Sequence, residues 1–391
     1  MGIGLITGGA GDDPAGIVTY TIVGATTGFQ LLWLMLLSTP MMVAVQSTVA
    51  RIALTTGKSL PELTTAYYRR ATTFVVIVIL AIANVLTIGA DLEAVASILA
   101  VATGLDPVWF LLPLTALVGY LVIFRAYATI KRVLVGMSFV LVVYIGAAAL
   151  AQPDVGEMIR GTLVPSTTFS SAFLLAALGL LGTTMSPYLM FWQASEEREE
   201  HPTVAQAQSA DTGTAIGMIY SNLLAYFMIV AGAVTLSGIT VVTVTDVADA
   251  LTPVAGHYAF ALFSIGVIVS GLLAIPVLAG STAYAVADSF GWREGLNEKV
   301  ADARGFYVVF VGAMLLGALI DLSPVSAVDA LYYSQVLDGL LLPFLVAVML
   351  LIANNPTIMG TRTNTRFNNV FGILALVVSA ALGLVMIIGL I

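Results

Sequence analysis

Two short stretches of sequence decide how this chain folds: GGAGDDPAG at residues 8–16 and GTTMSPY at residues 182–188. Each stretch combines glycine with a proline, Pro14 or Pro187, and proline lacks a backbone N–H and clashes with the preceding turn of a helix. Each stretch also lies inside a long apolar segment. The sequence therefore predicts two long helices that are each broken part-way along their length.

The chain around these breaks has the composition of an integral membrane protein. Of its 391 residues, 59% are hydrophobic and only 9% are charged, whereas a soluble chain carries about 25% charged residues. Its apolar runs match the roughly 20 residues that a helix needs to cross the hydrocarbon core. They are too long for the short alternating strands of an outer-membrane barrel. The predicted fold class is an all-α integral membrane protein.

Several classes of function are excluded by residues that are scarce or missing. The chain has no cysteine, which removes disulfides, thiolate zinc sites and iron–sulfur clusters. Its net charge of −8 argues against nucleic acid as a partner, because phosphate contacts need clustered Lys and Arg. No pairing of a nucleophile with a base and no cofactor motif is visible. Neither enzymatic activity nor a resident cofactor is expected.

Hydropathy and the spacing of glycine, proline and charged residues predict about eleven transmembrane spans. With the N-terminus in the cytoplasm, every Lys and Arg except Arg160 falls near a cytoplasmic span end, as the positive-inside rule requires. This sorting predicts a multi-pass protein of the cell membrane with its C-terminus outside. The spans are placed at residues 3–27, 29–55, 72–102, 107–126, 131–152, 168–199, 211–236, 257–289, 303–321, 327–353 and 368–391.

The two breaks fall in the first and sixth spans, an offset of five. Because five is odd, the second set of five spans crosses the membrane in the opposite sense, which makes residues 1–152 and 168–353 candidate inverted repeats. Residues 368–391 add one helix to a single transporter domain, 1–391. Unwound backbone at membrane depth is tolerated where it is packed in protein or lines a water-filled cavity, and paired breaks point to a transport site. Ordinary proline kinks are the alternative.

Two acids adjoin the first break. An ionised Asp12 or Asp13 inside the bilayer costs about 3 kcal/mol or more unless water or a cation compensates it. The second break offers the hydroxyl groups of Thr183 and Ser186 and carbonyl groups freed from helical bonding. Such oxygen ligands suit Mg²⁺, Ca²⁺ and Mn²⁺, so a hard divalent ion is expected here. For Asp12 the alternative is a residue at the lip of the break, held by a helix-terminus amide.

Two further groups of polar residues lie inside apolar spans. Asn84, Thr87 and Asp91 share one face of the third span, because they are spaced i, i+3 and i+7. They indicate either a hydrated path or a proton relay, or else hydrogen bonds between helices, worth about 0.6 kcal/mol each. Gln335 and Asp338 share a face of the tenth span. The Gln335 amide would complete the shell of a cation or bridge two helices, and Asp338 would lie close to the ion or be a buried acid held neutral by desolvation.

A run of acids ends the sixth span. Residues 196–201 read EEREEH, which places acids at a helix C-terminus, where the helix dipole disfavours them. The run indicates either an inner vestibule that concentrates cations or a solvated loop.

At these residues the sequence resembles the Nramp family of divalent-metal transporters. The resemblance is carried by DPAG at residues 13–16, TGKSLPE at 56–62, the pair at 91–92, SQV at 334–336 and LPF at 342–344. It extends from the first predicted span to the tenth. It implies the 5+5 inverted-repeat fold shared with amino-acid symporters of the LeuT type, with alternating access around a site between the first and sixth spans.

The resemblance also implies a set of ion ligands. Carried over residue by residue, the site comprises the side chains of Asp13, Ser186 and Gln335 and the carbonyl groups of Ala10 and Thr183. The residues expected around the ion or along its pathway are Asp12, Gly16, Tyr188, Asn84, Thr87, Asp91 and Asp338.

The chain departs from the family pattern at several of these positions. The family's Met-Pro-His motif corresponds to Ser186-Pro187-Tyr188, its second histidine to Trp192, its first-span asparagine to Gly16 and a third-span acid to Ala94. Loss of sulfur removes the preference for transition metals, and loss of side-chain ligands leaves room for water. Mg²⁺ usually keeps several waters, so this pattern resembles the Nramp-related magnesium transporters. Proton coupling is expected to be weak or absent, because mainly Asp91 remains of the proton-linked groups.

The sequence therefore predicts a secondary transporter that carries Mg²⁺, and also Mn²⁺, as substrate, driven by the ion gradient and the membrane potential. The first alternative is a proton-coupled Mn²⁺ or Fe²⁺ importer that uses Met185 after a local register shift. The second is an organic-solute symporter on the same fold, which Asp13 argues against because it would repel a substrate carboxylate. The expected partners are the divalent ion and the lipid bilayer, with the protein acting as a monomer.

Overall fold

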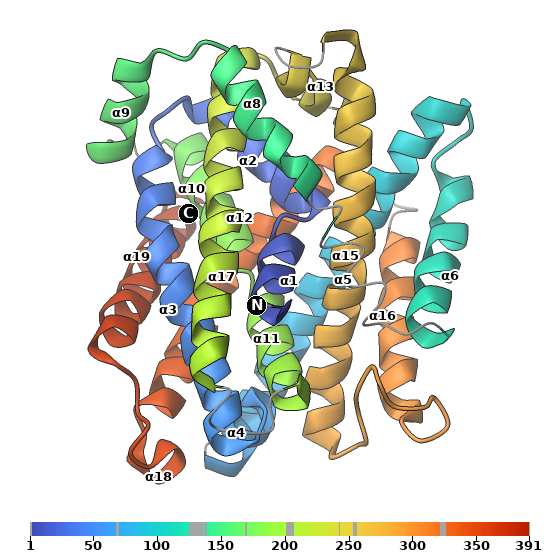
Figure 1. The fold of residues 1–391 in the computed structure, drawn as a ribbon, viewed down its shortest axis with the longest axis vertical. Helices are drawn as coiled ribbons and strands as arrows, with labels where there is room; N and C mark the ends of the chain where they lie inside the picture. The colour runs from blue at the N-terminus through green and yellow to red at the C-terminus, as the bar shows by residue number, and fades with distance from the viewer. Residues whose placement is uncertain are drawn as a thin grey trace.

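The protein is built from helices packed side by side (Figure 1). The computed structural model describes residues 2–67, 70–124, 136, 139–168, 170–200, 207–241, 243–252, 256–320 and 326–390, and these contain no strand. In chain order the helices are α1 (Gly2–Gly11), α2 (Pro14–Thr27), α3 (Leu32–Thr56), α4 (Leu60–Tyr67), α5 (Arg70–Thr103), α6 (Val108–Phe124), η1 (Phe139–Val142), α8 (Val143–Leu150), α9 (Val155–Leu163), α10 (Ser171–Thr184), α11 (Pro187–Glu200), α12 (Ala207–Thr235), α13 (Val244–Ala248), η2 (Asp249–Leu251), η3 (Gly256–Tyr258), α15 (Ala259–Phe290), α16 (Arg304–Ile320), α17 (Ala327–Ala353), α18 (Pro356–Met359) and α19 (Arg366–Leu390).

The predicted spans coincide with these helices. In the described part of the chain seven helices are long and apolar enough to cross a membrane, or eight if the bent pair of η1–α8 and α9 is one span. The first predicted span is the broken pair α1–α2, and α6 and α16 are shorter apolar helices. Of the fifth predicted span, residues 131–135, 137 and 138 lie outside the described residues, as do 125 and 126 at the end of the fourth. The count of eleven crossings stays a prediction.

One segment predicted as a loop is partly helical. Within residues 153–167 the chain forms α9, which meets the preceding helix at 118°. Asp154 caps α9, because its side chain accepts a hydrogen bond from the backbone N–H of Glu157. We call the end of the molecule that carries α9 the α9 end, and the opposite end, which carries α4 and α18, the α4 end (Figure 1).

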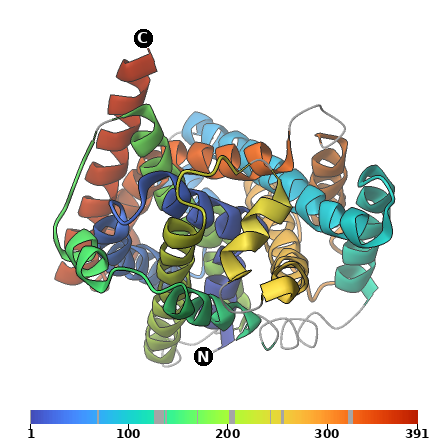
Figure 2. The same cartoon turned by 90° about the horizontal axis from the view of Figure 1, so that it is seen from above.

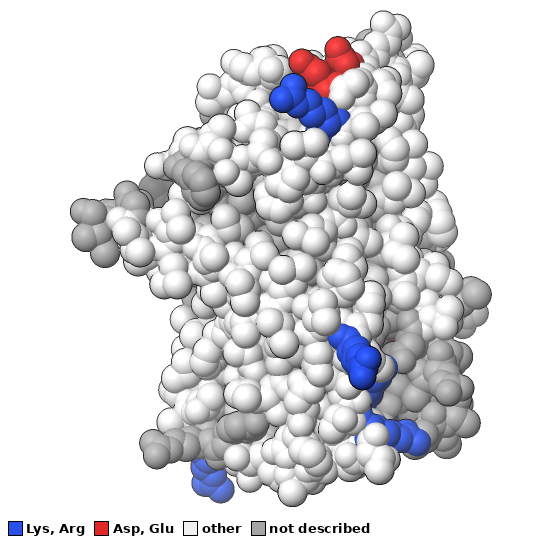
Figure 3. All heavy atoms as spheres, turned by 90° about the vertical axis from the view of Figure 1, so that its left-hand side faces the viewer, with Lys and Arg blue, Asp and Glu red and all other residues white. Residues whose placement is uncertain are grey.

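The surface matches a protein embedded in lipid. On the face shown in Figure 3, charged side chains lie towards the two ends, and a broad band between them carries none. Large hydrophobic side chains such as Phe74, Trp109 and Ile388 are more than 60% exposed. Exposure of this kind is unfavourable in water and favourable in hydrocarbon, so these side chains face the bilayer.

Both breaks lie where the sequence predicts them. α1 ends at Gly11 and α2 begins at Pro14, whereas α10 ends at Thr184 and α11 begins at Pro187. In each case proline takes the first position of the second half-helix, where its missing N–H costs no hydrogen bond. The broken helices lie at the centre of the bundle: α2 packs against α10 and α12, and α10 packs against α17 (Figure 2).

Glycine brings α10 and α17 into backbone contact beside the second break. A Cβ atom on Gly182 would collide with the carbonyl oxygen of Gln335, and one on Gly339 would collide with the carbonyl oxygen of Leu178. Only glycine permits this approach at either position. The contact therefore places residues 335–338 of α17 directly beside the unwound backbone of the sixth span.

Candidate functional site

The first half of the site is built around the start of α2. Asp13 has extended backbone angles and is the N-cap of the helix, and its Oδ1 accepts a 2.5 Å hydrogen bond from the backbone N–H of Gly16. A carboxylate at this position satisfies one of the free amides of the first turn and interacts favourably with the helix dipole. The side chain is 1% exposed.

Asp91 of α5 supports the same turn. Its Oδ1 accepts a hydrogen bond of 3.1 Å from the backbone N–H of Ala15. Two carboxylates therefore converge on the start of α2, one from within the broken helix and one from a neighbour. The polar stripe of the third predicted span reaches the site through Asp91, and the amide that it binds explains why an acid is tolerated there.

Tyr188 joins the two breaks. Its hydroxyl group, in the first turn of α11, donates to the carbonyl oxygen of Ala10 at 2.7 Å and to Oδ2 of Asp13 at 3.2 Å. Both acceptors are predicted ion ligands. The Tyr188 hydroxyl thus lies between two oxygens that a bound cation would share, and its proton partly offsets their negative charge.

The predicted ligands of the second break are hydrogen-bonded to one another. Ser186 donates through Oγ to the carbonyl oxygens of Gly182 and Thr183, both at 2.9 Å. The side chain of Thr183 faces α2, because a Cβ atom on Gly16 would lie 2.8 Å from Thr183 Oγ1. The absence of a side chain at Gly16 therefore lets the two broken helices meet here.

On the α17 side of the site, several buried oxygen atoms accept no hydrogen bond from the described part of the chain. Gln335 is fully buried, and its amide nitrogen donates to Ser334 at 3.2 Å while Oε1 has no hydrogen-bond partner in the described part of the chain. Both carboxylate oxygens of Asp338 are likewise without a partner there, and the residue is 1% exposed. Such buried acceptors are costly in the absence of a cation or water.

Three of the residues predicted around the ion hydrogen-bond elsewhere, Asp12 and Asn84 to other helices and Thr87 within its own. Asp12 accepts a hydrogen bond of 3.0 Å from Ser221 of α12. Asn84 donates to Ser281 and Thr282 of α15, each at 2.8 Å, which is the hydrogen bonding between helices that the sequence left open. Thr87 donates to the carbonyl oxygen of Ala83 in its own helix.

A group of hydrogen-bonded polar side chains links α1, α11 and α12, and it was not predicted from the sequence. Gln193 of α11 accepts a hydrogen bond of 2.6 Å from Thr7 and donates to Glu197 at 2.7 Å and to Thr214 at 3.1 Å. The i, i+4 spacing of Gln193 and Glu197 was the available signal. Glu196 and Glu197 are 4% and 1% exposed, so the solvated-loop interpretation is wrong for these two acids.

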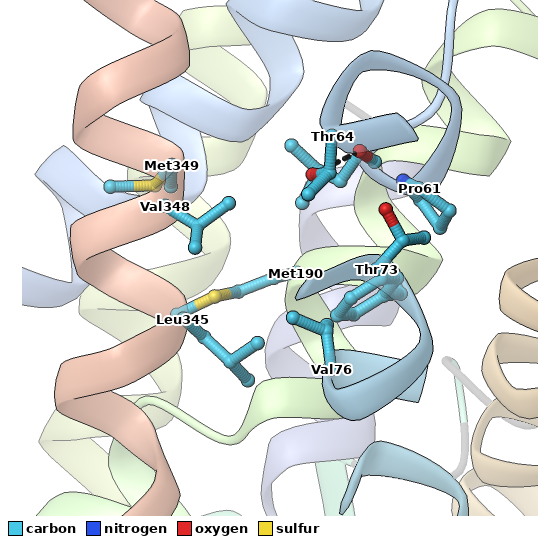
Figure 4. A pocket seen from close by; sticks show the side chains of 10 residues that line it. Pro61, Thr64, Thr73, Val76, Met190, Leu345, Val348 and Met349 are labelled. Atoms are coloured by element: carbon cyan, nitrogen blue, oxygen red, sulfur yellow. Dashed lines mark hydrogen bonds between the residues drawn. The ribbon is translucent and has the colours of Figure 1, made fainter. Parts of the chain in front are cut away.

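Arg198, next to Glu197 in the sequence, forms ion pairs at the α4 end. It forms ion pairs of 3.4 Å with Glu62 of α4 and with Asp288 of α15, and a third with Glu294. These contacts tie α11 to α4 and α15. A small pocket nearby is lined by Thr64, Met190, Leu345 and other mainly apolar side chains (Figure 4). Its apolar walls are unsuited to binding a hydrated cation.

The predicted ligands at the breaks are all oxygen atoms. Among the described residues, no three His, Cys, Asp or Glu side chains are gathered in an arrangement that would hold a metal ion. Any ion bound at the breaks would therefore combine single carboxylates with hydroxyl, carboxamide and carbonyl oxygens and with water. That combination is typical of hard cations.

The comparison with known families bears directly on this arrangement. The sequence profile of the family described as "Natural resistance-associated macrophage protein-like", or Nramp, matches residues 4–389. The chain belongs to the Nramp family. The resemblance seen in the sequence motifs is thus confirmed for the family as a whole, whereas the match does not distinguish the magnesium-transporting branch.

Curated relatives in the Nramp family are transporters. The divalent metal cation transporters MntH of Klebsiella pneumoniae (strain 342) and Bacillus subtilis (strain 168) are each 27% identical to this chain. The alignments cover 94% and 96% of this chain and 89% and 88% of the relatives. The expectation that the chain is not an enzyme is confirmed by these relatives.

Solved structures establish the fold. A manganese transporter of Eremococcus coleocola has a TM-score of 0.79 at 17% identity, covering 98% of this chain and 85% of that one. MhsT, solved in complex with L-phenylalanine, has a TM-score of 0.67 at 14% identity and covers 99% and 97%. The predicted all-helical LeuT-type fold is therefore confirmed.

Proposed function

We propose that this Nramp-family chain is a secondary transporter for divalent metal cations that carries Mg²⁺ and also Mn²⁺ by alternating access. The ion binds between the two breaks, at Asp13, Ser186, Gln335 and the carbonyl groups of Ala10 and Thr183. The protein acts as a monomer in the cell membrane, with its N-terminus in the cytoplasm and its C-terminus outside. The divalent class is supported by the MntH relatives.

The observation that carries the preference for a hard ion is the chemistry of the second break. Hydroxyl groups of Ser186 and Tyr188 occupy the positions nearest the proline, and Met185 is fully buried within the hydrophobic core. Neither Ser186 nor Tyr188 offers the sulfur or imidazole that favours transition metals. An oxygen-only site with water present fits Mg²⁺, which gives up its waters reluctantly.

Weak or absent proton coupling follows from the same residues. Tyr188 and Trp192 stand where the family has histidines, and a phenol or an indole does not exchange protons near neutral pH. Of the family's proton-linked acids in the third span mainly Asp91 remains, and it is bound to the backbone of α2. The membrane potential and the ion gradient then supply the driving force, since each divalent ion carries two charges across the field.

The described conformation fits an occluded state of this cycle. Asp13, Gln335 and Asp338 are at most 1% exposed, and the Arg198 ion pairs hold the α4 end together. Entry and release of the ion therefore require each end to open in turn, and α1 and α11 are the half-helices on the α4 side of the breaks.

The test is uptake into proteoliposomes at a fixed membrane potential, comparing Mg²⁺, Mn²⁺ and Ca²⁺ while an internal dye follows pH. We expect Mg²⁺ and Mn²⁺ to enter without matched acidification, and Asp13→Ala to abolish entry of both ions. Empty liposomes and the Asp12→Asn variant are the controls. Unchanged uptake by Asp13→Ala would overturn the proposed site.

The main alternative is a proton-coupled Mn²⁺ or Fe²⁺ importer of the ordinary Nramp kind, which the names of the relatives favour. Met185→Ala separates the two, because a thioether ligand matters for Mn²⁺ and not for Mg²⁺. A selective loss of Mn²⁺ uptake in this variant, or Mn²⁺ entry with matched proton flux, would establish the alternative.

A further inference from the structure

Asp338 is a buried acid whose carboxylate has no partner among the residues that the structure describes. It lies in the middle of α17, it is 1% exposed, and neither of its carboxylate oxygens has a hydrogen-bond partner in the described part of the chain. The described ion pairs belong to other acids. A buried carboxylate in this position requires a cation, water or a proton.

The position of Asp338 is set by close packing beside the second break. Its neighbour in sequence, Gly339, lies against the backbone of α10 at Leu178 and Gly182. One turn earlier on α17, the carbonyl group of Gln335 touches Gly182. Asp338 is therefore held by α17 against the last turns of α10, and residue 338 cannot move away without separating the two helices.

Asp338 lies close enough to Asp13 for the two buried carboxylates to repel each other when both are ionised. Asp13 approaches from the start of α2, whereas Asp338 approaches from α17. Gln335 Oε1, one turn before Asp338, is a further buried oxygen without a hydrogen-bond partner among the described residues. Thr183 Oγ1 lies beside Asp13, because a Cβ atom on Gly16 would be 2.8 Å from Thr183 Oγ1 and 3.0 Å from Asp13 Oδ1. Buried oxygen atoms from α2, α10 and α17 thus lie at the two breaks.

We infer that Asp338 is a second carboxylate of the ion site, and that the divalent cation is held with part of its water shell between Asp13 and Asp338. The inference rests on the proposed transport of divalent cations and deepens it. Two carboxylates on opposite sides neutralise the two charges of the ion. Water between ion and carboxylate accounts for a site with few direct side-chain ligands.

Asp13 and Asp338 contribute to ion binding in different ways. Asp13 has both oxygens hydrogen-bonded, to Gly16 and to Tyr188, so an ion that binds Oδ2 directly competes with the Tyr188 hydroxyl group for its lone pairs. The oxygens of Asp338, which have no partner among the described residues, accept hydrogen bonds from the waters of the ion. Asp338 therefore contributes to the affinity for a hydrated divalent ion before any direct contact with Asp13 forms.

The experiment compares wild type, Asp338→Asn, Asp338→Glu and Asp13→Asn as purified full-length proteins. The readouts are the increase in Tm on titration with Mg²⁺ and, separately, the KM of Mg²⁺ uptake into proteoliposomes. Asp338→Asn keeps the size of the side chain and removes its charge. We expect its half-saturating Mg²⁺ concentration to rise about tenfold or more in both assays, while Asp338→Glu stays within about threefold of wild type. The matched control is Asp329→Asn, on the same helix but at its exposed start.

Half-saturation of Asp338→Asn within about twofold of wild type, alongside loss of binding in Asp13→Asn, would overturn the role of Asp338 and leave the proposed function standing. Failure of wild-type protein to bind or transport any divalent ion would overturn the proposed function itself.

If Asp338→Asn does not give monodisperse protein, Gln335→Glu decides, because it adds a carboxylate beside Asp338. Tighter Mg²⁺ binding by Gln335→Glu supports the inference, and unchanged or weaker binding contradicts it.

Discussion

At the scale of single residues, the site is defined by oxygens that bind one another in the absence of an ion. Tyr188 donates to Ala10 and Asp13, and Ser186 donates to the carbonyl groups of α10. A cation that binds these oxygens competes with the hydroxyl protons for their lone pairs. Affinity therefore depends on the competing hydroxyl groups as well as on the ligands.

Tyr188→Phe tests this competition. The variant removes the hydroxyl group and keeps the ring, so Ala10 and Asp13 become free to bind the ion. We expect the half-saturating Mn²⁺ and Mg²⁺ concentrations to fall severalfold, and the free energy of unfolding without ion to fall by about 1 kcal/mol, because hydrogen bonds are lost. Isothermal titration and denaturant unfolding measure the two quantities. Weaker ion binding would show that the hydroxyl group is a ligand instead of a competitor.

Gly16→Ala tests the meeting of the two broken helices. The added Cβ atom would lie 2.8 Å from Thr183 Oγ1 and 3.0 Å from Asp13 Oδ1, so one of them must move. We expect a loss of about 1–3 kcal/mol in stability, as for other overpacked sites, together with a higher KM for Mg²⁺. Thr183→Ala in the same chain should restore part of the stability. Equal stability of the Gly16→Ala variant and wild type would contradict this close approach.

At the scale of elements, two kinds of contact join the helices. One is the glycine contact between α10 and α17, and the other is the set of ion pairs of Arg198. Gly182 and Gly339 lock α10 to α17 through their backbones. Arg198, in contrast, joins α11 to α4 and α15 through side chains that can separate. The α4 end is therefore expected to open by movement of α11 and α1.

Arg198→Ala should favour the state that is open at the α4 end, because it leaves Glu62, Asp288 and Glu294 close together without a cation. The chain has no cysteine, so Met190→Cys places a single thiol in the nearby pocket (Figure 4). We expect a maleimide to label this thiol several times faster when Arg198→Ala is also present. The control is Arg293→Ala, which removes an exposed ion pair with Glu298. Equal labelling rates for all three proteins would show that Arg198 does not hold this end closed.

At the scale of the whole molecule, the uncharged band of Figure 3 and the position of basic residues define an orientation in the membrane. The helices α9 and α18 lie at opposite ends of the molecule (Figure 1). We expect the α4 end to lie in the cytoplasm, because the positive-inside rule retains basic residues on that side. The orientation in turn determines which end admits the ion from outside.

Single-cysteine labelling of intact cells measures this orientation. Val164→Cys, just after α9, should react with an impermeant maleimide added outside, because Val164 is 53% exposed. Thr361→Cys, just after α18, should react only after the membrane is permeabilised. The reverse pattern would place the N-terminus outside and overturn the proposed topology.

The sequence by itself determined the class of the protein, the places of the two breaks and the family. These follow from local properties: apolar length sets the spans, proline stops a helix wherever it stands, and motifs such as the one at residues 13–16 need no neighbours to be recognised. Asp13 and Gln335 were also predicted as site residues, because polar side chains are costly in hydrocarbon and stand out against it.

Only the tertiary structure decided which polar residues meet. The sequence spacing places Asn84 and Asp91 on the same helical face, yet Asn84 binds α15 and Asp91 binds the start of α2. Tyr188 reaches two predicted ligands at once, and Asp338 has no donor among the described residues. Such contacts depend on how closely helices approach, which small residues such as Gly182 permit. Periodicity places a residue on a face of its helix, and packing between helices determines what that face touches.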